Sequence, residues 1–352
     1  MIDTGHLKLA VGSRAARGAS PDGEGLLDIV DLKTHFVTPR GIARAVDGVS
    51  LRVRRGTTLG IVGESGSGKS VLSRTIMGIL ARDGSVRHSG RIMFQGRDLR
   101  TLAEREMRAV RGRDIAMIFQ DPMSSLNPVM KIGNQITEVL RAHLGMSSAA
   151  ARGRAAELLD LVGLPDPQRQ LDRYPVHLSG GMRQRVAIAV ALAAEPRLLI
   201  ADEPTTALDV TVQSQILELL RSLQRQRDMS VILITHNLGI VSGYTDDLIV
   251  MYAGRIVETA PTRDLLSRPL MPYTEALMQS SPVLTAPPHT RLTAIPGLPP
   301  SLIDPTAGCR FGPRCRYATD TCRERAPALL PDAAGGHLYA CHHPLPVPET
   351  SA

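Results

Sequence analysis

The amino-acid sequence predicts an α/β protein in which helices cover a parallel sheet, preceded by a sheet-rich lobe. Two observations carry this prediction. Three short β-like runs come before the first strongly helical segment, Val71 to Leu80. Helix-like and strand-like segments then alternate between residues 180 and 236, a pattern typical of a parallel sheet. With 352 residues, the chain can bury one large domain plus a smaller appendage.

The elements are expected in a definite order. Residues 1–25 are rich in Gly, Ala, Ser and Arg without apolar periodicity, which predicts a flexible N-terminal tail. Between about 122 and 177, apolar residues recur at three- and four-residue spacing, which predicts a helical insertion. The strand-like runs are LLDIVDLKTHFV (26–37), AVDGVSLRV (45–53), TLGIVG (58–63), RLLIADEP (197–204) and SVILITH (230–236). The later helix-like runs are GGMRQRVAIAVALAAE (180–195) and VQSQILELLRSLQRQ (212–226).

Proline becomes frequent beyond Pro261, in runs such as PVLTAPPH and PGLPPSLIDP. This composition predicts a linker or an irregular module with little regular structure. We therefore place the main domain at residues 26–265 and a small C-terminal module at 266–352.

Composition narrows the class of protein. The longest apolar stretch, Val186 to Ala194, is cut short by Glu195 and Pro196, so no membrane-spanning segment is expected. The N-terminus lacks the apolar stretch of a secretory signal, which predicts cytosolic residence. The net charge of +7 comes from dispersed Arg residues, and four Phe and no Trp offer little base stacking. No nucleic-acid partner is therefore expected, whereas a surface near anionic lipid suits the charge.

One Gly-rich motif predicts an ATP site. GESGSGKS, at residues 63–70, fits the pattern GxxxxGK[ST], follows a strand-like run and opens a helical segment. The glycines let backbone N–H groups face an anion, Lys69 would reach the β- and γ-phosphates, and Ser70 would bind Mg²⁺. The alternative is a Gly-rich turn without function. The expected phosphate-binding residues are Gly63, Ser65, Gly66, Gly68, Lys69 and Ser70.

Acidic and polar residues at neighbouring strand ends extend this site. Asp202 and Glu203 end the apolar run LLIADE, where Asp202 would hold Mg²⁺ and Glu203 would orient and deprotonate the attacking water. His236 follows the run VILIT and could donate a hydrogen bond to the γ-phosphate. Gln120, after IAMIF, could place its amide near the metal and the water. Each residue alone could equally be structural, so the assignment depends on the whole set.

Residues 178–184, LSGGMRQ, resemble the signature sequence of ABC ATPases. Together with GESGSGKS, Gln120, LLIADEP, Ala207-Leu-Asp209 and His236, the full ordered set of that family is present. The resemblance implies a P-loop NTPase (RecA-like) core with an antiparallel β lobe. It also implies that Ser179, Gly180, Gly181 and Asp209 contact nucleotide held by the P-loop of a second ABC ATPase subunit, either a paralogue or the same chain. An aromatic residue stacks on adenine in this family, and Phe36 is the candidate.

Within that family, FQDPMSSLNP (119–128), AVDGVSLRV and the tail GCRFGPRC (308–315) resemble ATP-binding subunits of dipeptide, oligopeptide and nickel importers. The resemblance implies two integral-membrane permease subunits and an extracytoplasmic solute-binding protein as partners. It places the subunit peripherally at the cytoplasmic face of the cell membrane. Import of nickel or another solute stays open, as does a soluble ABC ATPase outside transport. A P-loop kinase or GTPase would lack LSGGM and the His after VILIT.

The four Cys residues of the chain are Cys309, Cys315, Cys322 and Cys341, with spacings C-x5-C, C-x6-C and C-x18-C. In a cytosolic chain such clustering favours metal over disulfides, and it suits zinc or an iron–sulfur cluster. Four unlinked thiols are the third alternative. The resemblance to peptide-importer subunits favours a structural [4Fe-4S] cluster, with Zn²⁺ as the alternative.

Overall fold

The computed structural model describes residues 25–81, 83–121, 125–206, 208–280 and 293–346. The expected tail lies almost wholly outside these residues, as do Pro122 at the start of the expected insertion and Ala207 of the ALD motif. Within the described ranges, no helix is both long enough and apolar enough to cross a bilayer.

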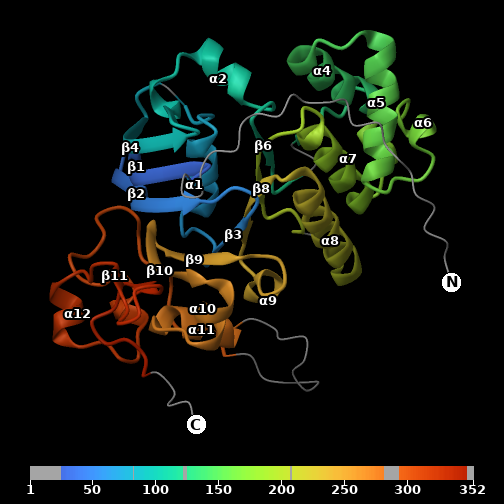
Figure 1. Cartoon of the computed structure of the whole chain (residues 1–352). Helices are drawn as coiled ribbons and strands as arrows, with labels where there is room; N and C mark the ends of the chain where they lie inside the picture. Colours follow the sequence, from blue (N-terminus) through green and yellow to red (C-terminus); the bar gives the residue numbers. More distant parts are fainter. Residues whose placement is uncertain (1–24, 82, 122–124, 207, 281–292, 347–352) are drawn as a thin grey trace.

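Two sheets organise the fold (Figure 1). The first is antiparallel, in the order β2-β1-β4-β5. It contains two of the three runs expected in the N-terminal lobe, whereas the third run, TLGIVG, forms β3 of the second sheet, and β4 and β5 follow the phosphate motif in the chain. The second has the order β11-β12-β10-β9-β3-β8-β7-β6 and is parallel from β9 to β6. This arrangement confirms the expected α/β class. The strands are β1 (Leu27–Thr38), β2 (Gly41–Val53), β3 (Thr58–Val62), β4 (Val86–Phe94), β5 (Arg97–Asp98), β6 (Ile115–Ile118), β7 (Leu198–Asp202), β8 (Ser230–Thr235), β9 (Asp247–Tyr252), β10 (Arg255–Pro261), β11 (Leu330–Pro331) and β12 (Leu338–Tyr339).

Helices cover this sheet and form a lobe of their own beside β6 (Figure 1). In that lobe α4, α5 and α7 share one apolar core with residues of α8 and the sheet. The α-helices are α1 (Lys69–Ile76), α2 (Glu104–Val110), α4 (Ile132–Leu144), α5 (Ser148–Leu161), α6 (Pro167–Gln170), α7 (Gly180–Leu192), α8 (Val210–Arg227), α9 (Leu238–Val241), α10 (Thr262–Ser267), α11 (Pro272–Ser280) and α12 (Asp320–Glu324). The short 3₁₀ turns are η1 (Leu99–Thr101), η2 (Pro175–His177) and η3 (Gly312–Arg314).

The central strands owe their position to continuous apolar runs. Every residue of β3, β6, β7 and β8 is buried. Parallel strands with helices on both faces require such runs, because neither face meets water. A second apolar core joins these strands to the antiparallel lobe and to α1. The carboxyl ends of β3, β7 and β8 are thereby held at one edge of a rigid sheet.

Two expectations about element boundaries were wrong. The helix expected to reach Leu80 ends at Ile76, because Gly78 adopts a left-handed φ of 60°. The segment after Pro261 was expected to be irregular, and residues 293–311 have no helix or strand, but residues 262–280 form α10 and α11. Here Pro261 caps α10 and Pro272 opens α11, and proline at a helix start costs no intrahelical hydrogen bond. Proline content therefore indicated helix starts in this segment, where we had expected a linker.

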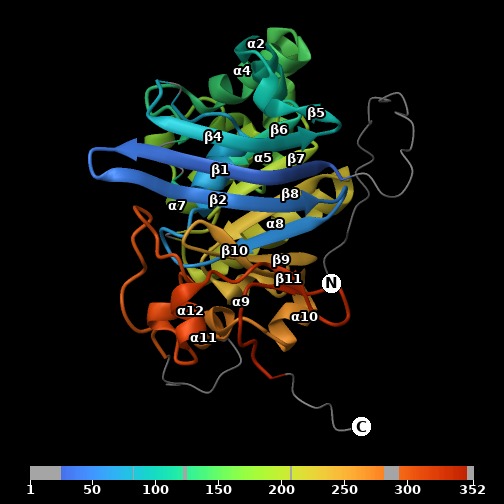
Figure 2. The same ribbon diagram turned by 90° about the vertical axis from the view of Figure 1, so that its left-hand side faces the viewer.

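The C-terminal residues pack beneath β10 and continue the main sheet (Figure 2). Glu258 and Thr259 of β10 pair with Tyr339 and Leu338 of β12. The module is thus attached to the main domain by backbone hydrogen bonds and by a shared apolar cluster that includes Tyr252 of β9 and Phe311 of the module.

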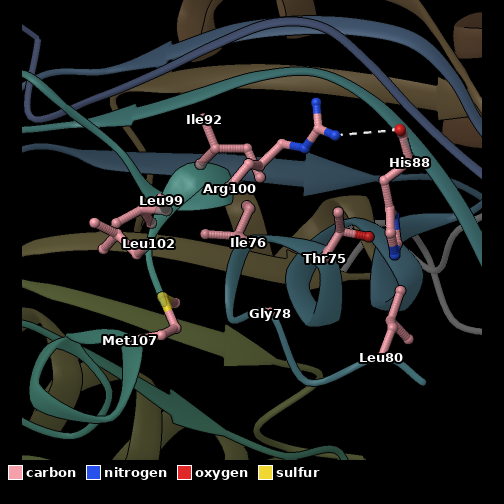
Figure 3. Close-up of a pocket in the computed structure, with 10 residues that line it drawn as sticks. All are labelled: Thr75, Ile76, Gly78, Leu80, His88, Ile92, Leu99, Arg100, Leu102 and Met107. Atoms are coloured by element: carbon pink, nitrogen blue, oxygen red, sulfur yellow. Dashed lines mark hydrogen bonds between the residues drawn. The ribbon is translucent and has the colours of Figure 1, made fainter. Parts of the chain in front are cut away.

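A pocket lies at the carboxyl end of α1 (Figure 3). Its lining is mostly apolar, and Arg100 closes one side by donating from Nη2 to the His88 carbonyl at 3.1 Å. Burial and the nearby Arg100 lower the pKa of His88. The phosphate motif is at the opposite end of α1, so this pocket is separate from the candidate site.

Candidate active site

The phosphate motif forms a loop between β3 and α1, and three of its glycines occupy positions where a larger residue would be strained. Gly63 and Gly68 have φ of 152° and 102°. A Cβ on Gly63 would lie 2.2 Å from the Met251 carbonyl oxygen, and one on Gly68 would lie 2.1 Å from that of Ala45. Gly66 is in open space but has a left-handed φ of 79°. Only glycine suits these three positions without rearrangement.

Lys69 lies buried beneath this loop. Its Nζ donates to the carbonyls of Gly63 at 2.8 Å and Glu64 at 2.9 Å, and contacts the Ser67 hydroxyl at 3.3 Å. Burial lowers the pKa of the Lys69 ammonium, while the carboxylates of Glu203, Asp202 and Glu64 oppose that shift. A positive charge is therefore held against two backbone carbonyls and a hydroxyl.

Asp202 ends β7 next to the start of α1. Its Oδ1 accepts from the Ser70 hydroxyl at 3.0 Å, and its Oδ2 accepts from Ser73 at 3.3 Å. Burial raises the pKa of this carboxyl, the Ser70 hydrogen bond opposes the rise, and the neighbouring Glu203 charge adds to it. A hydroxyl and a carboxylate are thus adjacent, and hard oxygen donors of this kind are what Mg²⁺ prefers.

Gln120 and His236, two further residues expected at the site, both lie next to the Glu203 carboxylate. Oε2 accepts from Gln120 Nε2 at 2.8 Å and from the Thr206 hydroxyl at 2.9 Å. His236 Nδ1 lies 3.2 Å from Oε1. Strand register explains the meeting, since Val62 of β3 pairs with Thr235 of β8, and Asp202 pairs with Ile234. Glu203 itself has a left-handed φ of 49°, a strained conformation often found at functional sites.

The signature residues lie at the start of α7, and their described contacts are within their own lobe. Ser179 caps the helix by accepting from the Met182 N–H at 3.4 Å, and both Ser179 and Gly180 are exposed. A Cβ on Gly181 would lie 3.0 Å from Val212 of α8. Asp209 is also exposed and caps α8 through the Val212 N–H at 3.0 Å. Ser179 and Gly180 therefore lie at the exposed start of α7, and Asp209 lies at the exposed start of α8.

Phe36 lies in the antiparallel lobe. It is half-buried on β1, opposite Ala43 of β2 and Val86 of β4. Two residues before it, the Thr34 hydroxyl contacts that of Thr75 on α1 at 3.0 Å. Phe36 is therefore on a strand that packs against the helix of the phosphate motif.

The four Cys residues, Cys309, Cys315, Cys322 and Cys341, line one small pocket. The Cys309 N–H donates to the Cys322 carbonyl at 2.7 Å, which brings the two halves of the module together. Burial raises the pKa of the Cys309, Cys315 and Cys341 thiols, that of Cys341 to about 11. Across the described residues, no group of three or more His, Cys, Asp or Glu side chains is placed to hold a metal ion.

Sequence reasoning missed the residues that hold the phosphate loop from outside. Arg314 forms two hydrogen bonds with the Glu64 carboxylate, and Tyr273 Oη accepts from the Glu64 N–H at 2.9 Å. Arg310 bonds Asp47 and the Ala253 carbonyl. The only signal in the sequence is that both arginines directly adjoin a Cys.

Comparisons with known proteins agree with this geometry. Residues 46–206 match the family described as ABC transporter, and residues 257–322 match the oligopeptide/dipeptide transporter C-terminal region. The oligopeptide transport ATP-binding protein OppD of Bacillus subtilis is 52% identical over 87% of this chain and 85% of its own length. The dipeptide transport ATP-binding protein DppD of Escherichia coli is 48% identical over 91% and 97%.

A solved ATP-binding cassette, described as a dimer in a post-hydrolysis state bound to ADP and phosphate, has a TM-score of 0.61. It shares 27% identity and covers 67% of this chain and 99% of its own. ATP and Mg²⁺ are the ligands expected of such a cassette. The chain therefore belongs to the ABC transporter family, among the ATP-hydrolysing subunits that carry the oligopeptide/dipeptide C-terminal region.

Proposed function

We propose that this chain hydrolyses ATP to power the uptake of di- or oligopeptides by an ABC importer. The observation that carries the proposal is the convergence of Lys69, Ser70, Asp202 and Glu203 at one sheet edge, joined to a C-terminal region of the peptide-transporter type. The names of the relatives support peptides over nickel or another solute.

Each residue of the phosphate loop has a proposed role. Gly63, Ser65, Gly66 and Gly68 present backbone N–H groups to the phosphates, and Lys69 supplies a point charge to the β- and γ-phosphates. Ser70 and Asp202, which already share a hydrogen bond, would hold Mg²⁺ with Gln120. Phe36 is proposed to stack on adenine.

Glu203 is proposed as the general base. Its Oε2 is held by Gln120 and Thr206, so the carboxylate is oriented before water arrives. Oriented groups lower the barrier because the entropy of positioning has already been lost. His236, now 3.2 Å from Oε1, is proposed to donate to the γ-phosphate, and Gln120 to place the water. Bound Mg²⁺ would neutralise charge on the phosphates.

A complete site is proposed to need two ATPase subunits, a paralogue or a second copy. The chain holds one phosphate motif and one LSGGM, and Ser179 and Gly180 are exposed at a helix start that suits an anion. Ser179, Gly180, Gly181 and Asp209 would then contact nucleotide held by the partner subunit's phosphate loop.

We further propose the remaining partners and the division of the chain. Two integral-membrane permease subunits and an extracytoplasmic solute-binding protein would complete the importer, with this subunit peripheral at the cytoplasmic face of the membrane. Residues 26–265 would form the ATPase domain, its helical part at about 122–177 would transmit motion to the permeases, and residues 266–352 would form the Cys module.

The Cys module is proposed to bind a [4Fe-4S] cluster through Cys309, Cys315, Cys322 and Cys341. All four thiols line one pocket, and four-thiolate sets suit such clusters as well as zinc. Zn²⁺ held by the same four thiolates is the alternative. The cluster would crosslink a segment with few apolar residues.

Metal analysis after anaerobic purification tests the cluster. Four iron and four sulfide per chain, with broad visible absorption, are expected for [4Fe-4S]. One zinc per chain would favour the alternative, and no metal with four titratable thiols would contradict both.

Transport is tested in proteoliposomes that contain this chain, its partner cassette and the permeases, with binding protein outside and ATP enclosed. Labelled di- and oligopeptides are expected to accumulate, whereas Ni²⁺ is not. Accumulation of Ni²⁺ without peptide would show that the substrate assignment is wrong. Glu203→Gln vesicles serve as the matched control, because that variant should bind ATP without turnover.

A further inference from the structure

Arg314 of the C-terminal module forms hydrogen bonds with Glu64 of the phosphate loop. Its Nη1 donates to Glu64 Oε2 at 2.6 Å and its Nη2 to Oε1 at 3.0 Å. The Arg314 side chain is 5% exposed and that of Glu64 is 24% exposed. A bidentate Arg–carboxylate pair of this kind is both strong and directional, because the planar fork matches the two oxygens. Two segments 250 residues apart are thus locked together.

The backbone of Glu64 is held from the same side. The Glu64 N–H donates to Tyr273 Oη at 2.9 Å, and Arg314 Nη1 also contacts Tyr252 Oη at 3.2 Å. The rings of Tyr252, Tyr273 and Phe311 pack with centroids 4.5 to 5.4 Å apart. Side chain and main chain of one loop residue are therefore fixed by a rigid aromatic cluster that includes the module's Phe311.

A second arginine of the module, Arg310, is linked to the loop through intervening residues. Arg310, nearly buried, bonds Asp47 and the Ala253 carbonyl. The Asp47 N–H donates to the Gly254 carbonyl at 2.8 Å, and the Gly254 N–H donates to the Ser67 carbonyl at 2.9 Å. This line of hydrogen bonds ends at Ser67 inside the phosphate motif.

The charge of Glu64 gives Arg314 an electrostatic consequence. Glu64 is the second residue of the phosphate motif, and its carbonyl accepts from Lys69 Nζ at 2.9 Å, so its carboxylate lies near where the phosphates of ATP are proposed to bind. An uncompensated carboxylate there would repel a polyanion. The Arg314 guanidinium, paired with both oxygens of the carboxylate, compensates this charge.

We propose that Arg314 is a positioning residue for the phosphate loop, and that the Cys module sets the ATP affinity of this subunit by pairing Arg314 with Glu64. This inference rests on the proposed role of the loop in binding ATP. The module would act by pre-organising the loop and cancelling the Glu64 charge, so that less ordering and less repulsion oppose binding.

Equilibrium binding of MgATP to variants of the full chain tests the inference. Arg314→Gln is expected to raise the Kd about tenfold, the cost of one charge-assisted contact. Arg316→Gln is the matched control, because Arg316 is in the same module but is exposed and bonds Glu275 at 2.8 Å, away from the loop. It should leave the Kd within about twofold of wild type. Glu64→Gln combined with Arg314→Gln should bind no more weakly than Arg314→Gln alone, since the repelling charge is gone.

Several results would overturn the inference. They are a wild-type Kd for Arg314→Gln, an equal loss for Arg316→Gln, or losses for Glu64→Gln and Arg314→Gln that multiply in the double variant. Arg314→Lys, which keeps the charge without the fork, should bind with intermediate affinity and replaces Arg314→Gln if the latter does not fold. Lys69→Ala separates the two proposals: if it weakens binding while Arg314→Gln does not, only this inference fails. If Lys69→Ala also leaves the Kd unchanged, the loop assignment itself fails.

Discussion

Replacing Glu203 with Gln should lower ATP turnover about 10²- to 10⁴-fold, the usual contribution of a positioned base. The Gln side chain keeps the volume, and its amide oxygen can still accept from Gln120 and Thr206, now bonded at 2.8 and 2.9 Å. What disappears is the negative charge beside His236 and the basic oxygen. In activation free energy the loss is about 3 to 5 kcal/mol. ATP affinity should stay near wild type, since Glu203 is not a proposed phosphate ligand.

Phosphate release at saturating MgATP, with ATP binding measured separately, checks this expectation. Glu195→Gln is a matched control, because Glu195 shares the left-handed backbone, with φ of 55°, but is exposed and bonds Arg154 at 3.0 Å. It should turn over ATP normally. A Glu203→Gln variant within about tenfold of wild-type turnover would refute the assignment of Glu203 as the base.

Lys69→Ala should weaken ATP binding itself, because the positive charge that contacts the phosphates is lost. An unchanged Kd for ATP would contradict the role proposed for Lys69. If this chain pairs with itself, mixing Ser179→Arg and Lys69→Ala chains should restore activity above either alone, since one intact composite site forms; no recovery would argue against action in trans. Asp47→Asn should destabilise the fold by about 3 kcal/mol at neutral pH, because Arg310 and Arg255 lose their shared carboxylate. Although burial opposes it, bonding to Arg255 and Arg310 lowers the folded-state pKa of Asp47 below its ordinary 3.8. The difference in free energy of unfolding between wild type and Asp47→Asn, measured with denaturant, should therefore have its full value above about pH 4 and become smaller as the pH falls further. A difference that is independent of pH would contradict this account.

The phosphate loop could be predicted from sequence because its chemistry is local. Eight contiguous residues carry both the backbone freedom and the charge, and the φ values of Gly63, Gly66 and Gly68 are those that such a loop requires. The meeting of Asp202, Glu203 and His236 was also predictable. Apolar runs mark parallel strands, and parallel strands end at one edge.

The segment after Pro261 shows where composition misleads. Proline counts suggested an irregular chain, which residues 293–311 are, yet α10 and α11 begin at or directly after a proline. A count ignores position, and proline breaks a helix only in its interior.

Local sequence decided the backbone geometry of the proposed phosphate loop, and tertiary packing decided what holds that loop in place. Nothing near GESGSGKS indicates that Glu64 pairs with Arg314, 250 residues later, or that Tyr273 holds its N–H. A turn is set by the φ and ψ of its own residues, whereas a buried ion pair depends on where two distant segments pack. The Cys spacing likewise predicted a cluster of thiols, but only the fold shows that the residues next to two of them reach the phosphate loop and Asp47 beside it.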